Sequence, residues 1–222
     1  MKVIQHRFGG PETLEVVESE PENPGADEVL VKVSYAGVNP IDIMTRNGGG
    51  MAGLMTLPYT LGWDLSGTVE VVGEGVNLAL GQRVCGLVRF PQEGGAYASS
   101  AVVPADNLVP VPENLSDEAA AALPLAAMTA WQAFQDTTVV EEGQRVLITG
   151  AGGGVGHLAV QLAHHLGLRW WPLLASKSTN GCAAWAHMRP WTTMTRRRWP
   201  PLNPWTWCTA WLRVPLKRRS RP

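Results

Sequence analysis

Apolar and polar residues alternate along several short segments in the first half of the chain. The run from Val29 to Val38 alternates as a half-buried strand does, and the runs Gly67–Val76 and Gln82–Val88 behave likewise. The segment Ala96–Pro112 adds two more short extended pieces that end in prolines. Many short strands at close spacing, separated by Gly and Pro, predict a small, partly closed β-barrel over the first 110 residues.

The pattern changes to helix and strand from Ser116 onward. Ser116, with acids directly behind it, begins an Ala-rich helical segment that Pro124 interrupts. Gln144–Gly150 is an apolar strand, and the residues after the following glycines form a helix that ends at Gly167. The second part of the chain therefore starts as an α/β unit.

The composition allows a folded core but is divided unevenly. The chain has 222 residues, 45% of them hydrophobic, and a formal net charge of −1. Residues 1–168 carry 7 basic and 19 acidic side chains, a net charge of −12, whereas residues 169–222 carry 11 basic and none acidic, a net charge of +11. The same 54 residues hold eight of the ten Trp. The two parts therefore need separate interpretations.

Several classes of protein are disfavoured by the sequence. No apolar run approaches the roughly 20 residues of a membrane span. The three cysteines, Cys85, Cys182 and Cys208, are too widely spaced for a disulfide framework or a C-x-x-C metal site. We therefore expect a cytoplasmic protein without a membrane partner.

A glycine-rich motif, GAGGGVG, lies between the predicted strand and helix, with Gly150, Gly153 and Gly156 three residues apart. Glycines at such a turn let the backbone approach a pyrophosphate, and the following helix offers free N–H groups and its positive dipole end. The spacing differs from G-x-G-x-x-G, and a glycine turn without a ligand is the alternative. The flanking strand and helix favour a nucleotide site.

Seven segments carry a resemblance to a known family. They are FGGPETLEVVE from Phe8, VKVSYAGVNPIDIMTRNG from Val31, LPYTLGWDLSGTVEVVGEGV from Leu57, GQRVCGLV, GGAYASSAVVPADNLVPVPENLS, ALPLAAMTAWQAF and VLITGAGGGVGHLAVQLAHHLG. In this order they resemble the zinc-independent quinone oxidoreductase branch of the medium-chain dehydrogenase/reductase superfamily. The resemblance covers residues 1 to about 168.

The resemblance implies both a fold and an activity. It implies an α/β protein in which a GroES-like catalytic β-barrel domain, residues 1–122, precedes the start of a Rossmann coenzyme domain, residues 123–168. NADPH binds between such domains, and hydride passes directly to a quinone, an enone or another small carbonyl electrophile. Members of the family often form homodimers through an edge strand of the coenzyme domain, which this chain lacks.

The resemblance also assigns site residues, one position at a time. It implies that Asn39 contacts the nicotinamide end of the coenzyme; the alternative is that Asn39 is a plain turn residue. It also implies that Thr129 lies beside the coenzyme; the alternative is that Thr129 is an ordinary helix residue. In the loop itself it implies a pyrophosphate site made by Gly150, Gly153, Gly154, Val155 and Gly156.

No catalytic group and no metal site stand out from the sequence. No general acid or base is evident, and hydride transfer can proceed largely by positioning. Zinc-binding members have Cys in the segment occupied here by YAGVNPID, and G-H-E where this chain has Gly62-Trp63-Asp64. We therefore expect no metal, and we expect Cys85 to be a buried apolar thiol.

The resemblance ends at residue 168. Residues 169–222 contain no Ile, Phe, Tyr, Asp or Glu. Since Trp and Met each have one codon, part of the nucleotide sequence is fixed and can be translated one base earlier. Trp170–Ala175 is then compatible with V-V-A-T-A-S, a second strand like that of the family, and Trp185–Thr193 with L-G-A-H-E-A-V-D-Y, close to the family's L-G-A-D-E-V-I-D-Y. We interpret residues 169–222 as an out-of-frame, disordered tail.

Three hypotheses on function follow. The first is an NADPH-dependent, zinc-independent oxidoreductase of the quinone reductase type, whose partner is a small electrophile and not a nucleic acid. The second is a folded barrel that binds no coenzyme, because the Rossmann domain is incomplete. The third, ranked last, is a basic, Trp-rich tail that binds nucleic acid or an anionic membrane. The prolines of the tail argue against an ordered binding face.

Overall fold

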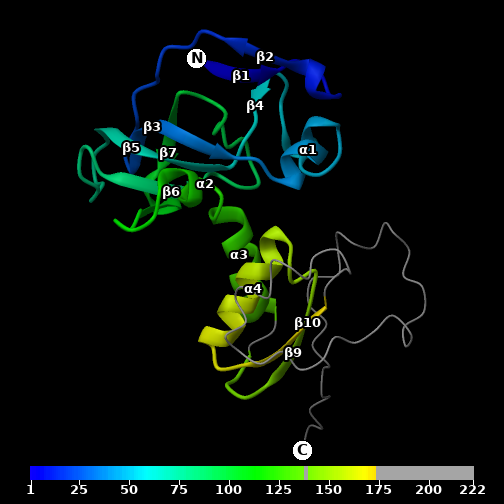
Figure 1. The fold of residues 1–222 in the computed structure, drawn as a ribbon. Coiled ribbons are helices and arrows are strands. Elements are labelled where there is room, and N and C mark those ends of the chain that lie inside the picture. Colours follow the sequence, from blue (N-terminus) through cyan, green and yellow to red (C-terminus); the bar gives the residue numbers. More distant parts are fainter. Residues whose placement is uncertain (138–139, 174–222) are drawn as a thin grey trace, which may run out of the picture. The chain divides into compact units, whose positions relative to one another are not determined.

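The computed structural model describes residues 1–137 and 140–173 and divides into two units (Figure 1). The first unit is Met1–Leu125, and the second begins at Ala126. Residues 174–222, which carry most of the predicted basic tail and the Trp185–Thr193 reading, lie outside the described residues. The expectation about homodimers, which concerns an edge strand of the coenzyme domain, stays a prediction.

The first unit is built from two antiparallel sheets. The five-stranded sheet has the order β7-β3-β5-β6-β8. Its strands are β3 (Glu28–Gly37), β5 (Asp64–Val72), β6 (Arg83–Leu87), β7 (Ser100–Pro104) and β8 (Leu108–Pro110). The smaller sheet has the order β2-β1-β4, with β1 (Lys2–Gln5), β2 (Leu14–Val17) and β4 (Tyr59–Thr60). Four of the predicted extended segments are thus confirmed as β3, β6, β7 and β8.

One strand differs from its predicted range. The run Gly67–Val76 was expected to be extended, but β5 begins three residues earlier and ends at Val72. The chain turns after Val72 because Gly75 has a φ of +84°, and a Cβ on Gly73 would lie 1.9 Å from the Gly25 carbonyl oxygen. The earlier start places Asp64 inside the sheet, where it pairs with Leu87 of β6.

The strands do not form a closed barrel by their hydrogen bonds within residues 1–125. The end strands β7 and β8 pair only inward, and a single bridge between Lys2 and Ala98 links the smaller sheet to the loop before β7. Register shifts at Leu30/Val31 and Val33/Tyr35 mark irregularities in β3, and such bulges bend a strand and increase its twist. The described strands thus form two antiparallel sheets in a mixed α/β unit, and their closure into a barrel stays a prediction.

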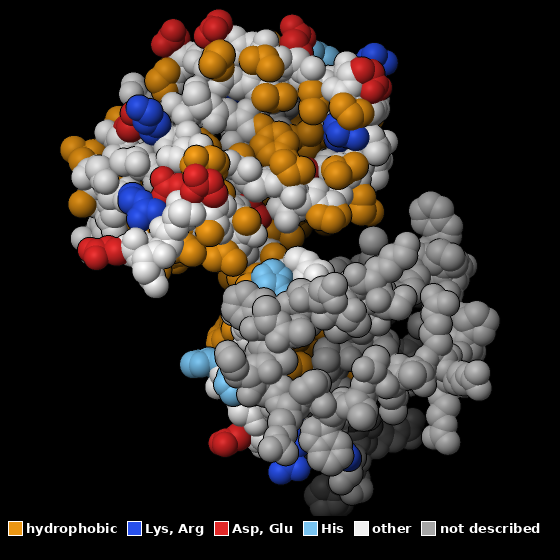
Figure 2. Space-filling model, viewed as in Figure 1, with side chains coloured by type: hydrophobic (Ala, Val, Ile, Leu, Met, Phe, Trp, Pro, Cys, Tyr) orange, Lys and Arg blue, Asp and Glu red, His pale blue; other side chains and the backbone are white. Residues whose placement is uncertain are grey.

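The core of the first unit lies on one face of the five-stranded sheet. Alternate residues of β3 and β5 point into it, which is the consequence of the period-2 pattern in the sequence. Its buried members are Val29, Val31, Leu65, Val69, Val84, Val88, Ala96, Ala101, Val103 and Leu108. Figure 2 shows that hydrophobic side chains also remain between charged ones on the visible surface of this unit; exposed examples are Val38, Ile43, Met44 and Leu54.

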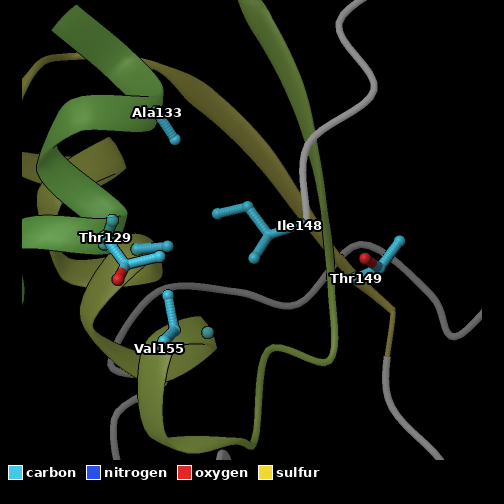
Figure 3. Close-up of a pocket in the computed structure, with 8 residues that line it drawn as sticks. Thr129, Ala133, Ile148, Thr149 and Val155 are labelled. Atoms are coloured by element: carbon cyan, nitrogen blue, oxygen red, sulfur yellow. The ribbon is translucent and has the colours of Figure 1, made fainter. Parts of the chain in front are cut away.

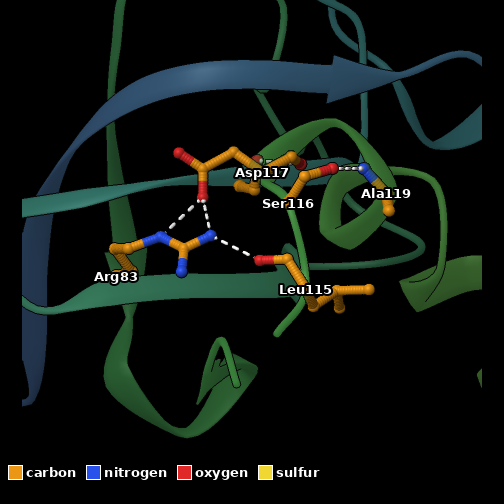
Figure 4. Close-up of polar contacts among 6 residues, drawn as sticks. Arg83, Leu115, Ser116, Asp117 and Ala119 are labelled. Carbon is orange, nitrogen blue, oxygen red and sulfur yellow. Dashed lines mark hydrogen bonds and ion pairs between the residues drawn. The ribbon is translucent and has the colours of Figure 1, made fainter. Parts of the chain in front are cut away.

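Short helices complete the first unit. They are α1 (Pro40–Arg46), α2 (Asp117–Ala121) and the 3-10 turns η1 (Pro11–Thr13), η2 (Ala52–Leu54) and η3 (Ala105–Asn107). Ser116 caps α2 as predicted, since its hydroxyl accepts a hydrogen bond from the Ala119 N–H at 3.3 Å. The Arg83 guanidinium on β6 donates hydrogen bonds to the Asp117 carboxylate and to the Leu115 carbonyl (Figure 4). These hydrogen bonds connect the start of α2 to the five-stranded sheet.

The second unit has the strand, glycine loop and helix that the sequence predicts. Its elements are α3 (Pro124–Gln132), which begins in the last two residues of the first unit, the π-helical turn η4 (Ala133–Thr137), β9 (Arg145–Thr149), α4 (Gly154–His165) and β10 (Arg169–Leu173). The helix α3 starts at Pro124, where the sequence predicts an interruption. The buried core joins β9 to α4. Its members are Ala130, Phe134, Val146, Ile148, Ala151, Ala159, Ala163 and Leu168.

The first five residues of the predicted tail form a strand. Arg169–Leu173 pairs with β9 in parallel, Arg169 opposite Arg145 and Leu173 opposite Thr149. The expected disorder therefore does not begin at residue 169. Trp170 packs against the core of the second unit, which explains why this stretch continues as a strand. None of the helices in the described residues is long and apolar enough to cross a membrane.

Candidate coenzyme site

The glycine loop between β9 and α4 has a conformation that requires glycine at two places. Gly150 directly follows β9 and has a φ of +64°, a region that side chains rarely adopt. A Cβ on Gly156 would lie 2.1 Å from the Gly150 carbonyl oxygen, so only glycine lets the first turn of α4 approach the end of the strand. These two residues make the tight turn and the close helix packing typical of a dinucleotide-binding loop.

Gly153 and Gly154 have a different environment. Gly153 is the N-cap of α4, and a Cβ there would lie 3.2 Å from the Gly150 carbonyl oxygen. Around Gly154 no neighbouring atom of the described residues lies within 4 Å of a Cβ position, and its φ is not in the left-handed region. Neither protein packing nor backbone conformation demands glycine at residue 154. The open space in front of it is what a ligand close to the backbone would need.

The start of α4 is suited to an anion. A helix leaves its first N–H groups without partners inside the helix, and its dipole is positive there. The first turn of α4 contains no acidic side chain that could take these donors, whereas two histidines, His164 and His165, lie in its last turn. The ring Nδ1 of His157 lies 2.9 Å from the Gly153 carbonyl oxygen, which fixes this histidine along the helix.

A pocket lies beside the loop within the second unit. Figure 3 shows Thr129, Ile148 and Val155 directed toward a common space between α3, β9 and α4. The pocket is lined by Thr129, Ala130, Ala133, Ile148, Thr149, Val155, Gly156 and Ala159. The structure thus brings Thr129 together with Val155 and Gly156 of the predicted loop, and the wall between them is mostly apolar.

Asn39 lies in the first unit and is held by two buried carboxylates. It is the N-cap of α1, and its backbone N–H donates to Asp42 Oδ2 at 2.6 Å. Its side-chain Nδ2 donates to Asp64 Oδ2 at 2.9 Å, and the Leu125 N–H donates to Asp64 Oδ1, also at 2.9 Å. Asn39 is therefore more than a turn residue, because both its main chain and its side chain are fixed.

Burial raises the pKa of both carboxyl groups. Asp42 is 2% exposed and Asp64 is fully buried. Loss of hydration raises the pKa of each from 3.8 to about 6, against the opposing effect of their hydrogen bonds. Burial, followed by the charge of Asp42, also raises the pKa of Tyr97. Asp42 Oδ1 and the Tyr97 hydroxyl have no hydrogen-bond partner of good geometry among the described residues, although each affects the pKa of the other.

Sequence reasoning did not single out Asp42, Asp64 or Tyr97. Asp42 could have been found, since Asn-x-x-Asp before a helix is a capping pattern. For Asp64 the only signal was its place after Gly62-Trp63, where zinc-binding members of the family have Glu. Its burial depends on contacts with Asn39 and Leu125, which are 25 and 61 residues away in the chain. Local patterns do not report such contacts.

The described residues contain no group of three or more His, Cys, Asp and Glu side chains arranged to hold a metal ion. Cys85 is buried and unbonded, in contact with Val111 and Ala120, as expected for an apolar thiol. Burial also raises the pKa of its thiol, which keeps it protonated and unreactive.

Comparison with known proteins places these features in one class. The model of the alcohol dehydrogenase GroES-like domain matches residues 25–113. Quinone oxidoreductase of Sus scrofa is 39% identical over 166 residues, which are 73% of this chain and 49% of that protein. The chain thus spans about half the length of the curated relatives that it matches. The first unit is a GroES-like domain of the dehydrogenase type.

Solved structures agree with the sequence comparison. The quinone oxidoreductase from Coxiella burnetii superposes with a TM-score of 0.77 and 34% identity, over 86% of this chain and 61% of that one. The Escherichia coli quinone oxidoreductase complexed with NADPH gives a TM-score of 0.72 and 31% identity, over 82% and 55%. The chain belongs to the medium-chain dehydrogenase/reductase superfamily, in its quinone oxidoreductase branch.

Proposed function

We propose that this chain binds NADPH and provides the coenzyme and nicotinamide contacts of a zinc-independent oxidoreductase that reduces a quinone, an enone or another small carbonyl compound. The observation that carries the proposal is the glycine loop, in which Gly150 and Gly156 are required by the backbone and Gly154 leaves open space at the start of α4. A structure of an NADPH complex exists for a relative of the same branch. No nucleic acid or membrane partner is part of the proposal.

The residues present fit the two ends of the coenzyme. The free N–H groups at the start of α4 bind the pyrophosphate oxygens, and the missing Cβ of Gly154 lets these oxygens come close to the backbone. Thr129 and the apolar wall of the pocket in the second unit contact the coenzyme beside the loop. Asn39 contacts the nicotinamide end and keeps its amide fixed through Asp64. When bound, the coenzyme supplies a hydride.

Catalysis in this proposal is by positioning. A hydride transfer needs the donor and acceptor carbons at close distance and in alignment, and correct placement alone can account for a large part of the rate. The reduction of a quinone also takes up one proton. The pKa values of Asp42 and Asp64 are raised to about 6, and in this proposal the two carboxyl groups hold Asn39 in place.

The test is coenzyme binding by the full chain, with two matched glycine variants. NADPH is titrated into the purified protein while coenzyme fluorescence and thermal stability are followed. Gly154→Ala and Gly53→Ala each add a Cβ where no neighbouring atom in the described part of the chain lies within 4 Å, so neither should disturb the fold. We expect Gly154→Ala to weaken NADPH binding about tenfold, a loss of about 1.4 kcal/mol, and Gly53→Ala to leave it unchanged.

Two outcomes would contradict the proposal. If the wild-type chain shows no fluorescence change and no stabilisation at millimolar NADPH, the chain is a folded domain without a coenzyme, and the second hypothesis replaces the first. Equal effects of the two variants would show that the coenzyme does not approach the backbone at Gly154. A parallel titration with NADH measures the preference between the two coenzymes.

A further inference from the structure

Asp64 occupies an unusual place for a carboxylate. It is fully buried on β5, and no Lys or Arg in the described part of the chain forms an ion pair with it. A buried charge without a counter-ion is costly, and a neutral residue of the same shape would avoid that cost. Its two hydrogen-bond partners among the described residues, the Asn39 side-chain amide and the Leu125 N–H, are donors.

We propose that Asp64 is a positioning residue that fixes the side-chain amide of Asn39 toward the coenzyme. This inference rests on the proposed function, in which Asn39 contacts the nicotinamide end. An ionised carboxylate only accepts hydrogen bonds, so the amide must turn its Nδ2 to Asp64 and its Oδ1 to the other side. Asp64 thus fixes the orientation of the Asn39 amide.

Asp42 fixes the same residue in a different way. Its Oδ2 accepts the Asn39 backbone N–H at 2.6 Å, and its own backbone N–H faces the Asn39 side chain in the reciprocal contact of a capping box at the start of α1. A capping contact of this kind is common at helix N-termini and has a local explanation. The contact from Asp64 is not local and acts on the amide itself. Among the side-chain hydrogen bonds of the described residues, the one to Asp64 is the contact that holds the Asn39 amide nitrogen.

The ionisation of Asp64 makes the coupling measurable. The titratable groups around it are Asp42 on α1, Cys85 on β6 and Tyr97 in the loop before β7. Burial raises the pKa of Asp64 to about 6, the Asn39 and Leu125 hydrogen bonds lower it, and the Asp42 charge raises it. Asp64 is therefore mostly ionised at pH 7.5. At pH 5 the Asp64 carboxyl is mostly protonated and carries a hydrogen on an oxygen that faces a donor. Its hydrogen bond to the Asn39 amide is then weaker.

The first experiment follows the Asn39 side-chain amide by NMR in the full chain between pH 5 and pH 7.5. Its resonance is assigned by its absence in Asn39→Ala. We expect a downfield amide proton at pH 7.5, as for a hydrogen bond to a carboxylate, that shifts with a midpoint of about 6 and is lost in Asp64→Asn. Asp106→Asn, at an exposed position, is the control and should leave the titration unchanged. A wild-type resonance that does not change with pH would overturn the inference even if Asp64→Asn fails to fold.

The second experiment links Asp64 to the coenzyme through a double-mutant cycle. We expect Asn39→Ala and Asp64→Asn each to weaken NADPH binding about tenfold at pH 7.5, and the double variant to be no weaker than either alone, because both act through one amide. If Asn39→Ala weakens binding and Asp64→Asn does not, or if the effects add, Asp64 has no positioning role. If the wild-type chain binds no NADPH, the proposed function fails as well, which is a different result from the loss of the Asp64 effect alone.

Discussion

Gly156 and Gly150 are in direct backbone contact across the turn between β9 and α4. A Cβ built on Gly156 would lie 2.1 Å from the Gly150 carbonyl oxygen and 2.7 Å from the Ala151 Cα. The contact allows the first turn of α4 to pack against the end of the strand. It therefore sets both the direction of the helix and the position of its free N–H groups.

Gly156→Ala should destabilise the second unit. The obstructing atoms belong to the backbone and cannot rotate away, so the loop or the helix must move, at a cost of about 1–3 kcal/mol. Urea unfolding with hydrogen exchange in β9 and α4 measures the loss. Gly154→Ala is the matched control: its Cβ meets no atom, and alanine is the better helix former, so stability should stay equal or rise by about 0.5 kcal/mol. Equal stability of the two variants would show that the close contact is absent in solution.

The loop and its flanking elements could be predicted because their signals are local. The apolar run before Gly150 indicates a strand, the glycines indicate the turn, and the periodic residues up to Gly167 indicate a helix. The start of β10 could not be predicted in this way. Arg169–Leu173 lacks a family-like sequence, but a parallel strand requires only an extended backbone beside β9, and Trp170 adds packing.

The polar cluster around Asn39 shows what the sequence could not reveal. The family resemblance points to Asn39, either as a coenzyme contact or as a plain turn residue. The structure shows the cap. The part played by Asp64 depends on the pairing of β5 with β3 and β6, which brings residues distant in the chain together. Long-range strand pairing of this kind leaves no mark on local periodicity.

Asp117→Asn should weaken the attachment of α2 to the sheet. Asp117 Oδ1 accepts two hydrogen bonds from the Arg83 guanidinium, at 2.9 and 2.6 Å, and the same guanidinium donates to the Leu115 carbonyl (Figure 4). Because both side chains are partly exposed, we expect a loss of only about 1 kcal/mol in the free energy of unfolding, and less in 1 M salt. Glu113→Gln, which removes an exposed carboxylate that forms no ion pair with the described residues, is the comparison. An effect that does not change with salt would contradict an electrostatic origin.

Ser116→Ala should destabilise the first unit by about 1 kcal/mol. The Ser116 hydroxyl accepts the Ala119 N–H, one of the donors that a helix as short as α2 leaves unpaired. Ser116→Asp keeps an acceptor at the same place and adds a favourable charge near the helix N-terminus, so it should restore stability. Thermal unfolding of the three proteins at one pH makes the comparison. A loss in Ser116→Asp as large as in Ser116→Ala would argue against capping as the role of the hydroxyl.

Asp42→Asn should change how stability depends on pH. Burial raises the folded-state pKa of Asp42 from 3.8 to about 6, so the folded protein binds more protons than the unfolded chain between these values. The stability that comes from the protonated group is full below pH 4 and is lost as the pH rises through about 6. Asparagine does not titrate and still accepts the Asn39 N–H. We compare the free energy of unfolding of Asp42→Asn with that of the wild type by urea unfolding at pH 4.5 and pH 7.5. The difference, variant minus wild type, should be about 1–3 kcal/mol larger at pH 7.5 than at pH 4.5. An identical difference at the two pH values would mean that Asp42 ionises in the folded protein as it does in the unfolded chain.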